Sequence, residues 1–149
     1  MKAENTTKIQ FDSLSINEAY ARSVVAAFLA RYDPTVPQLA DLKTAVSEAV
    51  TNCIVHAYPD SIGDITVQMR LYENGRTVVK VRDRGCGIEN VEQAMEPLFT
   101  TGGDDRSGLG FSVMESFTDR LKVSSRKGKG TVVTMEKYIV LRERQAKLP

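Results

Sequence analysis

Hydrophobic positions recur with helical spacing between residues 39 and 57. At 100° per residue, one side of a helix there collects Leu39, Leu42, Val46, Val50, Cys53 and Ala57. Thr35 with Pro37 predicts the start of this helix, and Pro59 predicts its end, because a residue that precedes proline avoids the helical region. The pattern therefore predicts a helix with an ordinary core-facing stripe.

The opposite side of this helix carries Glu48 and Asn52, four residues apart and one above the other. Glu48 is the only formally charged residue between Thr44 and Pro59, although a helix that merely covers a core has a charge-rich outer face. We therefore expect both faces to be covered. Such a carboxylate can act as a general base and the amide oxygen can bind a hard cation, but a surface i,i+4 polar pair has the same spacing.

The remaining pattern predicts a mixture of strands and helices. Five segments read as strands from their alternation or from the turns between them: 8–13, 65–71, 77–82, 121–124 and 131–135. Asn74-Gly75 supplies a hairpin turn. A capping box at Ser15–Glu18 predicts a first helix of about 16 residues that stops near Asp33. A short helix is predicted over 111–117, and we expect the charged tail from residue 141 to fray.

Composition bounds the class of protein. A chain of 149 residues with 42% hydrophobic residues fits one globular domain, 1–149 with a core at about 8–140. The formal charge of +1 gives no bulk attraction to nucleic acid or membrane. Residues 1–15 lack the apolar run of a signal peptide, so we expect a cytoplasmic protein. Cys53 and Cys86 lack metal-binding spacing and are expected to remain thiols.

Two glycine-rich segments predict ligand contacts. In residues 83–87, two glycines spaced by one residue follow Asp83 at a predicted strand end, so backbone can approach a ligand while the carboxylate accepts hydrogen bonds. Residues 100–110 hold four glycines and lead into the helix at 111. A glycine loop that leads into a helix presents free N–H groups to an anion and suits a mobile lid.

The order of these pieces resembles a known superfamily. The chain has no P-loop, no G-x-G-x-x-G opening a βαβ unit and no H-R-D catalytic loop. Glu48-x-x-x-Asn52, then Asp83-x-Gly85-x-Gly87, then Gly108-x-Gly110, is similar to the N, G1 and G2 boxes of the GHKL ATPases and kinases. Residues 47–52, 97–101 and 106–111 resemble more closely the anti-sigma F factor family, serine protein kinases of endospore-forming bacteria.

This resemblance implies the Bergerat fold. That fold is an α+β two-layer sandwich, in which helices cover one face of a mixed, mostly antiparallel sheet. ATP lies between the helices and a flexible lid. The likeness covers residues 8 to 140, essentially the whole chain.

The resemblance also implies residue roles. Glu48 would be the general base and Asn52 the Mg²⁺ ligand. Asp83 would accept a hydrogen bond from the adenine amino group, Gly87 would let adenine lie close, and Thr131 would support adenine through its hydroxyl group.

The remaining roles concern the phosphates. Gly108 and Gly110 would offer backbone N–H groups to them, and Arg106 would act in catalysis by neutralising charge on the transferring group. The readings of Arg106 as a solvated loop cation and of Asp83 as a β-turn aspartate stay open. The nucleotide-binding positions implied by the boxes are Asn52, Asp83, Gly85, Gly87, Thr100, Thr101, Gly108, Leu109, Gly110 and Thr131.

The function implied is an anti-sigma factor that binds Mg-ATP, holds a sporulation sigma factor as a homodimer and phosphorylates a serine of its anti-anti-sigma antagonist. Exposed Arg22 is where the family places partner contacts. One alternative is a sequestering module with vestigial phosphotransfer, because Gly102 stands where the family commonly has lysine. Another is the stress-response anti-sigma kinase relative. Arg84 also departs from the family, which usually has an acidic residue there.

Two other branches of the superfamily fit the sequence less well. A sensor histidine kinase needs a phosphoacceptor histidine before the boxes, and the only histidine is His56. An ATPase of the gyrase, chaperone or mismatch-repair branch needs a downstream domain that donates a lysine, and this sequence continues for only about 20 residues beyond the last box. We therefore expect neither.

Overall fold

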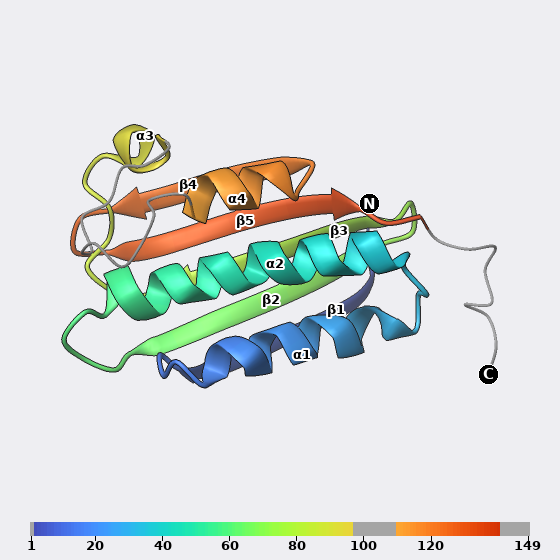
Figure 1. The fold of residues 1–149 in the computed structure, drawn as a ribbon, viewed down its shortest axis with the longest axis horizontal. Helices are drawn as coiled ribbons and strands as arrows, with labels where there is room; N and C mark the ends of the chain where they lie inside the picture. The colour runs from blue at the N-terminus through green and yellow to red at the C-terminus, as the bar shows by residue number, and fades with distance from the viewer. Residues whose placement is uncertain (1, 97–109, 141–149) are drawn as a thin grey trace.

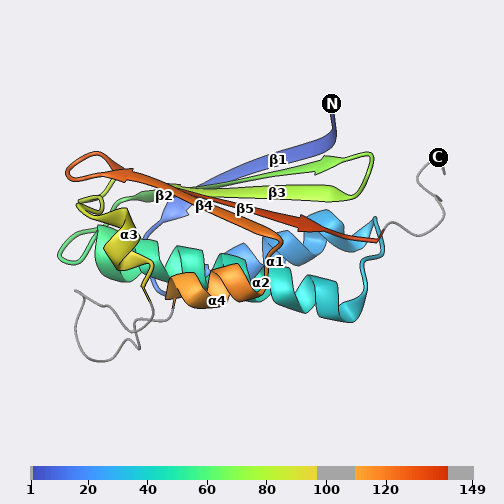
Figure 2. The same cartoon turned by 90° about the horizontal axis from the view of Figure 1, so that it is seen from above.

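The protein folds as one five-stranded sheet with a layer of helices on one face. The computed structural model describes residues 2–96 and 110–140. The strands lie in the order β1-β2-β3-β5-β4, and each neighbouring pair is antiparallel. Figure 1 looks onto the helical layer, and Figure 2 shows the same helices together below the sheet. The predicted α+β two-layer fold is confirmed, and the described sheet contains no parallel pair.

The strands and helices of the described residues have the following bounds. The strands are β1 (Ala3–Asp12), β2 (Asp64–Tyr72), β3 (Arg76–Asp83), β4 (Arg120–Arg126) and β5 (Gly130–Tyr138). The helices are α1 (Asn17–Ala30), α2 (Val36–Asn52), α3 (Val91–Ala94) and α4 (Gly110–Ser116), with one π-helical turn, η1 (Cys53–Ala57).

The hairpin between β2 and β3 follows its sequence pattern closely. Ile65, Val67, Met69 and Leu71 are buried, and the residues between them along β2 are more exposed. Gly75 has a φ of 87°, which is the left-handed conformation that the turn requires and that glycine adopts readily. The prediction of an Asn-Gly hairpin is confirmed.

The core lies between the inner face of the sheet and the helices. From α2 it receives the predicted Leu42, Val46 and Val50, and from η1 it receives Cys53. Leu39 and Ala57 are partly buried and pack against it. The predicted stripe therefore faces the core over its whole length, and burial of each large aliphatic side chain contributes about 1.5–3 kcal/mol.

The N-terminal helix begins differently from the prediction. Ile16 precedes α1 and no side chain caps the helix, so the predicted capping box at Ser15–Glu18 is wrong. The Glu18 carboxylate accepts a hydrogen bond from the Ser47 hydroxyl of α2 and pairs with Arg22. A tertiary contact has thus replaced the local cap. The reciprocal capping box forms instead at α2, between Thr35 and Gln38.

Candidate active site

Helix α2 is the middle helix of the layer and carries the predicted catalytic pair. It packs against α1 on one flank and α4 on the other, on the helical face of the sheet (Figures 1 and 2). Glu48 and Asn52 are both half-buried. The α-helix ends at Asn52 and continues as the π-helical turn η1, which ends before Pro59 as predicted. Both residues are therefore partly covered by the fold, and their predicted orientation toward a nucleotide stays a prediction.

Gly110 brings the third box to this pair. A Cβ atom placed on Gly110 would lie 3.1 Å from Oδ1 and 3.3 Å from Nδ2 of Asn52. The first residue of α4 thus faces the amide at the end of α2. Two segments that are about 60 residues apart in the sequence meet here, as the predicted nucleotide site requires.

Asp83 ends β3, and its carboxylate is held by hydrogen bonds to both oxygens. Its exposed fraction is 5%. The Gly85 N–H donates to Oδ1 at 2.9 Å, and the Cys53 thiol donates to Oδ2 at 3.4 Å. Burial raises the pKa of the Asp83 carboxyl, while hydrogen bonds from Gly85, Cys53 and the Thr131 backbone lower it by less. Asp83 is thus a buried carboxyl group in a fixed orientation.

Thr131 lies opposite Asp83 on the neighbouring strand, where the two are paired in the β3–β5 register. Its hydroxyl oxygen lies 2.7 Å from Ser125 Oγ. Ser125 donates its single proton to the Gly130 carbonyl at 2.9 Å and accepts from the Ile88 N–H at 2.8 Å. The Thr131 hydroxyl is therefore the donor to Ser125, and it would meet a ligand with its oxygen as an acceptor.

The glycines after Asp83 are required by contacts inside the protein. A Cβ on Gly85 would lie 2.3 Å from the Ala57 carbonyl oxygen. A Cβ on Gly87, whose φ is 73°, would lie 1.9 Å from the Arg126 carbonyl oxygen. The loop is thus clamped between η1 and the β4–β5 turn. Both glycines have a structural cause, and their predicted contacts with a nucleotide stay predictions.

Several predicted positions fall where the structure gives no description. They lie within residues 97–109: Thr100, Thr101, Arg106, Gly108 and Leu109. Their roles stay predictions, as does the effect of Gly102. In the described residues no group of three His, Cys, Asp or Glu side chains could hold a metal. Asn52 could supply one oxygen to Mg²⁺, which fits an ion that takes its other ligands from phosphates and water.

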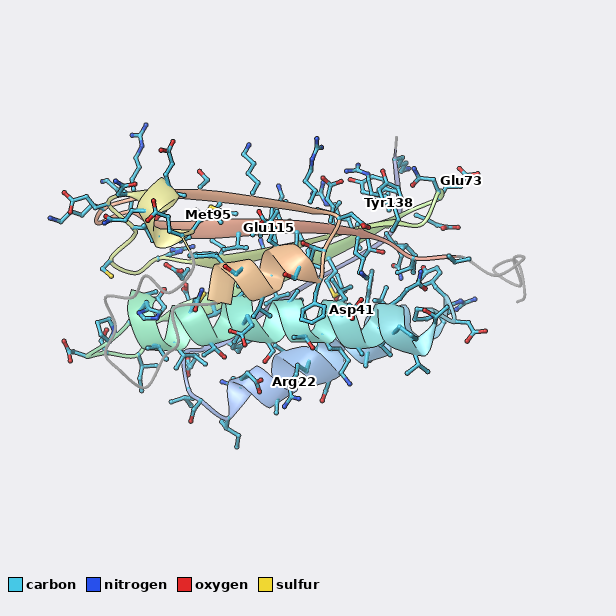
Figure 3. All side chains as sticks on the ribbon, turned by 45° about the horizontal axis from the view of Figure 1, so that its top comes forward. Arg22, Asp41, Glu73, Met95, Glu115 and Tyr138 are labelled. Atoms are coloured by element: carbon cyan, nitrogen blue, oxygen red, sulfur yellow. The ribbon has the colours of Figure 1, made fainter. Side chains whose placement is uncertain are left out.

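Arg22 lies on α1, in the helical layer (Figure 3). Its guanidinium is 3.2 Å from the Glu18 carboxylate, and the side chain is 44% exposed. Its Nε is buried and has no hydrogen-bond partner among the described residues. The same Glu18 carboxylate accepts a hydrogen bond from Ser47, the residue that precedes Glu48. The Arg22–Glu18 pair is therefore linked to α2 next to Glu48. The predicted partner role of Arg22 is not tested by these contacts.

Sequence reasoning missed two supports of the site. Cys53 was assigned to the core stripe alone, and its bond to Asp83 depends on how η1 lies against β3. Ser125 gave no signal, because its contact with Thr131 depends on the β4–β5 register. The short helix α3 was also missed, although Asn90, which caps the Gln93 N–H, is a usable start signal.

Comparison with known proteins identifies the family. Residues 13–137 match the model of the histidine kinase-like ATPase domain. The chain is 54% identical over 140 residues to the anti-sigma F factor of Caldanaerobacter subterraneus, covering 93% of this chain and 97% of that one. It is 48% identical over 141 residues to the anti-sigma F factor of Clostridium acetobutylicum, covering 94% and 98%. The chain belongs to the anti-sigma F factor family of histidine kinase-like ATPases.

Solved structures agree on the fold. The RsbU and RsbW domains of a Mycobacterium tuberculosis protein superpose with a TM-score of 0.69 at 21% identity, covering 94% of this chain and 34% of that one. The mycobacterial sensor histidine kinase MprB gives a TM-score of 0.58 at 16% identity, covering 91% and 100%. The GHKL-type fold expected of this family is confirmed. Within residues 2–96 and 110–140, no helix has the length and apolar character needed to cross a membrane.

Proposed function

We propose that this protein is an anti-sigma factor that binds Mg-ATP and transfers the γ-phosphoryl group to a serine of a partner protein. The names of its relatives support the proposal, because proteins that match nearly the whole chain are called anti-sigma F factor. One structural observation carries it. Half-buried Asn52, one helical turn after Glu48, lies beside Gly110, while buried Asp83 accepts a hydrogen bond from Cys53, the residue that follows Asn52. Base-binding and phosphate-binding groups thus converge on one end of α2.

In the proposed reaction, the phosphoryl group passes directly from ATP to the serine. Asp83 would accept a hydrogen bond from the adenine amino group, and Asn52 would supply one ligand to Mg²⁺, which neutralises phosphate charge. Glu48 would take the proton of the serine hydroxyl as the serine oxygen bonds to the γ-phosphorus. The bond from that phosphorus to the bridging oxygen breaks, and ADP leaves with the electron pair. Positioning and charge neutralisation supply most of the rate enhancement.

The partners follow from the same proposal. As a single domain in the cytoplasm, the protein would act as a homodimer that sequesters a sporulation sigma factor. It would release that factor when the unphosphorylated antagonist binds, without direct contact to nucleic acid or membrane. Arg22 supplies an exposed cation for the partner surface. Arg22→Glu would abolish sigma binding in a pull-down, and Arg70→Glu, on the sheet face away from the helices, would not; equal binding by both variants would reject this surface.

A second candidate rests on Gly102, which replaces the lysine common at that lid position. In this candidate the protein binds nucleotide and sequesters a sigma factor of a sporulation or stress-response circuit, but its phosphotransfer is vestigial. Incubation with γ-labelled ATP and purified antagonist separates the two. Label on an antagonist serine supports the kinase, and binding of both ligands without label supports the module.

A further inference from the structure

The buried thiol of Cys53 has a second task beyond filling the core. We propose that Cys53 is a positioning residue that makes the nucleotide site select an amino-bearing purine over an oxo-bearing one, acting through Asp83. The proposal rests on the function proposed above, since it assigns a base-selecting role within the same site. It concerns a residue that the sequence motifs leave unassigned.

The position of Cys53 follows from the end of α2. The α-helical pattern stops at Asn52, and Cys53 opens the single π-helical turn η1. Its side chain is 4% exposed and its Sγ lies 3.4 Å from Asp83 Oδ2, within reach of a sulfur hydrogen bond. Burial, the Asp83 charge and the hydrogen bond to that carboxylate raise the thiol pKa well above its ordinary value. Cys53 therefore stays protonated at neutral pH and acts as a donor.

This donor completes the fixation of the carboxylate. The Gly85 N–H occupies Oδ1 and the Cys53 thiol occupies Oδ2, so Asp83 cannot rotate without losing a bond to each oxygen. Both bonds stabilise the ionised form against the burial that disfavours it. An ionised carboxylate only accepts hydrogen bonds, whereas a protonated one also donates.

The state of Asp83 decides which base fits. A carboxylate accepts from an exocyclic amino group, as in adenine, and repels a carbonyl oxygen at the same ring position, as in hypoxanthine. A protonated Asp83 would donate to that carbonyl and lose the discrimination. Without the thiol donor, Oδ2 loses its partner, and the carboxylate is free to turn out of the orientation in which it accepts from an amino group. A site built for one hydrogen-bonding pattern discriminates strongly against the other because the mismatched polar groups are left unpaired.

Core packing is the competing explanation for Cys53, and three substitutions separate the two. Cys53→Ser keeps a donor in a smaller side chain. Cys53→Val fills the space without a donor, and Cys53→Ala removes both volume and donor. If Cys53 only packs, Val should preserve nucleotide selectivity as well as Ser does. If it positions Asp83, only Ser should preserve it.

The test measures binding of ATP and ITP by calorimetry, with Mg²⁺ and without antagonist, in the whole chain. The ratio of the ITP to the ATP dissociation constant should fall about tenfold in Cys53→Val and Cys53→Ala, the loss expected for one hydrogen bond to a charged group. It should stay within about twofold of wild type in Cys53→Ser. Val25→Ala, which removes packed volume from the buried face of α1, is the control for packing and should leave the ratio unchanged.

The outcomes separate this inference from the proposed function. Wild-type protein that binds neither nucleotide overturns both. Wild-type protein that prefers ATP while Cys53→Val keeps the same ratio overturns the role of Cys53 and leaves the proposed function standing. Circular dichroism confirms that each variant is folded before its ratio is read. If Cys53→Ala does not fold, the Val and Ser variants still decide the question.

Discussion

The two ends of the candidate site are built in different ways. Around Asp83, each carboxylate oxygen already has a donor, and the following loop is held against η1 and the β4–β5 turn. The side chains of Glu48 and Asn52 are half-buried and make no hydrogen bond to another residue within the part of the chain that the structure describes. The surroundings of Asp83, called the base end after their proposed role, thus have their hydrogen bonds in place without a ligand. Glu48 and Asn52, called the phosphate end after their proposed role, lack such partners among the described residues, and this comparison predicts different consequences for mutations at each end.

The largest effect is expected at the phosphate end. Glu48→Gln keeps the size of the side chain but removes the base, so the phosphotransfer rate should fall by about 10² to 10⁴, while ATP affinity changes by less than about threefold. Single-turnover transfer of label from γ-labelled ATP to the antagonist measures the rate, and calorimetry measures affinity. Glu115→Gln, an exposed change on α4, is the control. Unchanged transfer in Glu48→Gln would remove Glu48 from the reaction.

The tight packing of the loop after Asp83 predicts that substitutions at two glycines differ in their cost to the stability of the protein. Gly87 and Gly128 have φ values of 73° and 79°, but only Gly87 is crowded, by the Arg126 carbonyl. Gly128→Ala should cost about 1 kcal/mol of unfolding free energy for backbone strain alone. Gly87→Ala should cost at least about 3 kcal/mol, because backbone must also move. Urea unfolding measures both, and equal costs would show that the loop is not clamped.

At the base end, Asp83→Asn should weaken ATP binding by at least about tenfold, because an amide nitrogen replaces one acceptor for the adenine amino group. The defect should appear equally for adenosine, which has no phosphates. Asp12→Asn, at the exposed end of β1, is the matched control and should bind normally. A loss restricted to ATP, with normal adenosine binding, would place Asp83 with the phosphates and contradict the division into two ends.

The smallest expected effect is a pH dependence of adenosine binding. Burial places the pKa of Asp83 above the ordinary carboxyl value of 3.8. Protonation removes an acceptor, so affinity should be constant at neutral pH and fall several-fold as the pH drops through this raised pKa. Adenosine is used because it carries no titrating phosphate, and NMR shift titrations at each pH give the affinity. Affinity that does not fall on acidification, down to the lowest pH at which the protein stays folded, would show that Asp83 is not the acceptor.

The sequence predicts the parts of the molecule that depend on local patterns. The stripe from Leu42 to Cys53 and the hairpin around Gly75 are set by periodicity and by one turn, and both are confirmed. The start of β1 was placed at Lys8, but the strand begins at Ala3, because pairing with β2 continues where the side chains no longer alternate. Pairing of that kind is decided by the neighbouring strand.

The candidate site shows the same difference between features set by local sequence and features set by contacts between elements. The boxes predict Glu48, Asn52 and Asp83 as site residues because each lies in a short motif with fixed spacing. The hydrogen bonds of Cys53 and Ser125 were not predictable from local sequence. The Cys53–Asp83 bond joins residues about 30 positions apart, and the Ser125–Thr131 bond joins two paired strands. Glu18 shows the same limit, because its bond to Ser47 replaced the capping role that its local sequence predicts.

The most direct test of the account is a crystal structure with Mg²⁺ and a non-hydrolysable ATP analogue. The account predicts that the adenine amino group lies within hydrogen-bond distance of Asp83, that Asn52 contributes an oxygen to Mg²⁺, and that Glu48 faces the γ-phosphate. An analogue bound away from α2, or one whose phosphates lie at Asp83 with Glu48 and Asn52 in contact only with water, would contradict it.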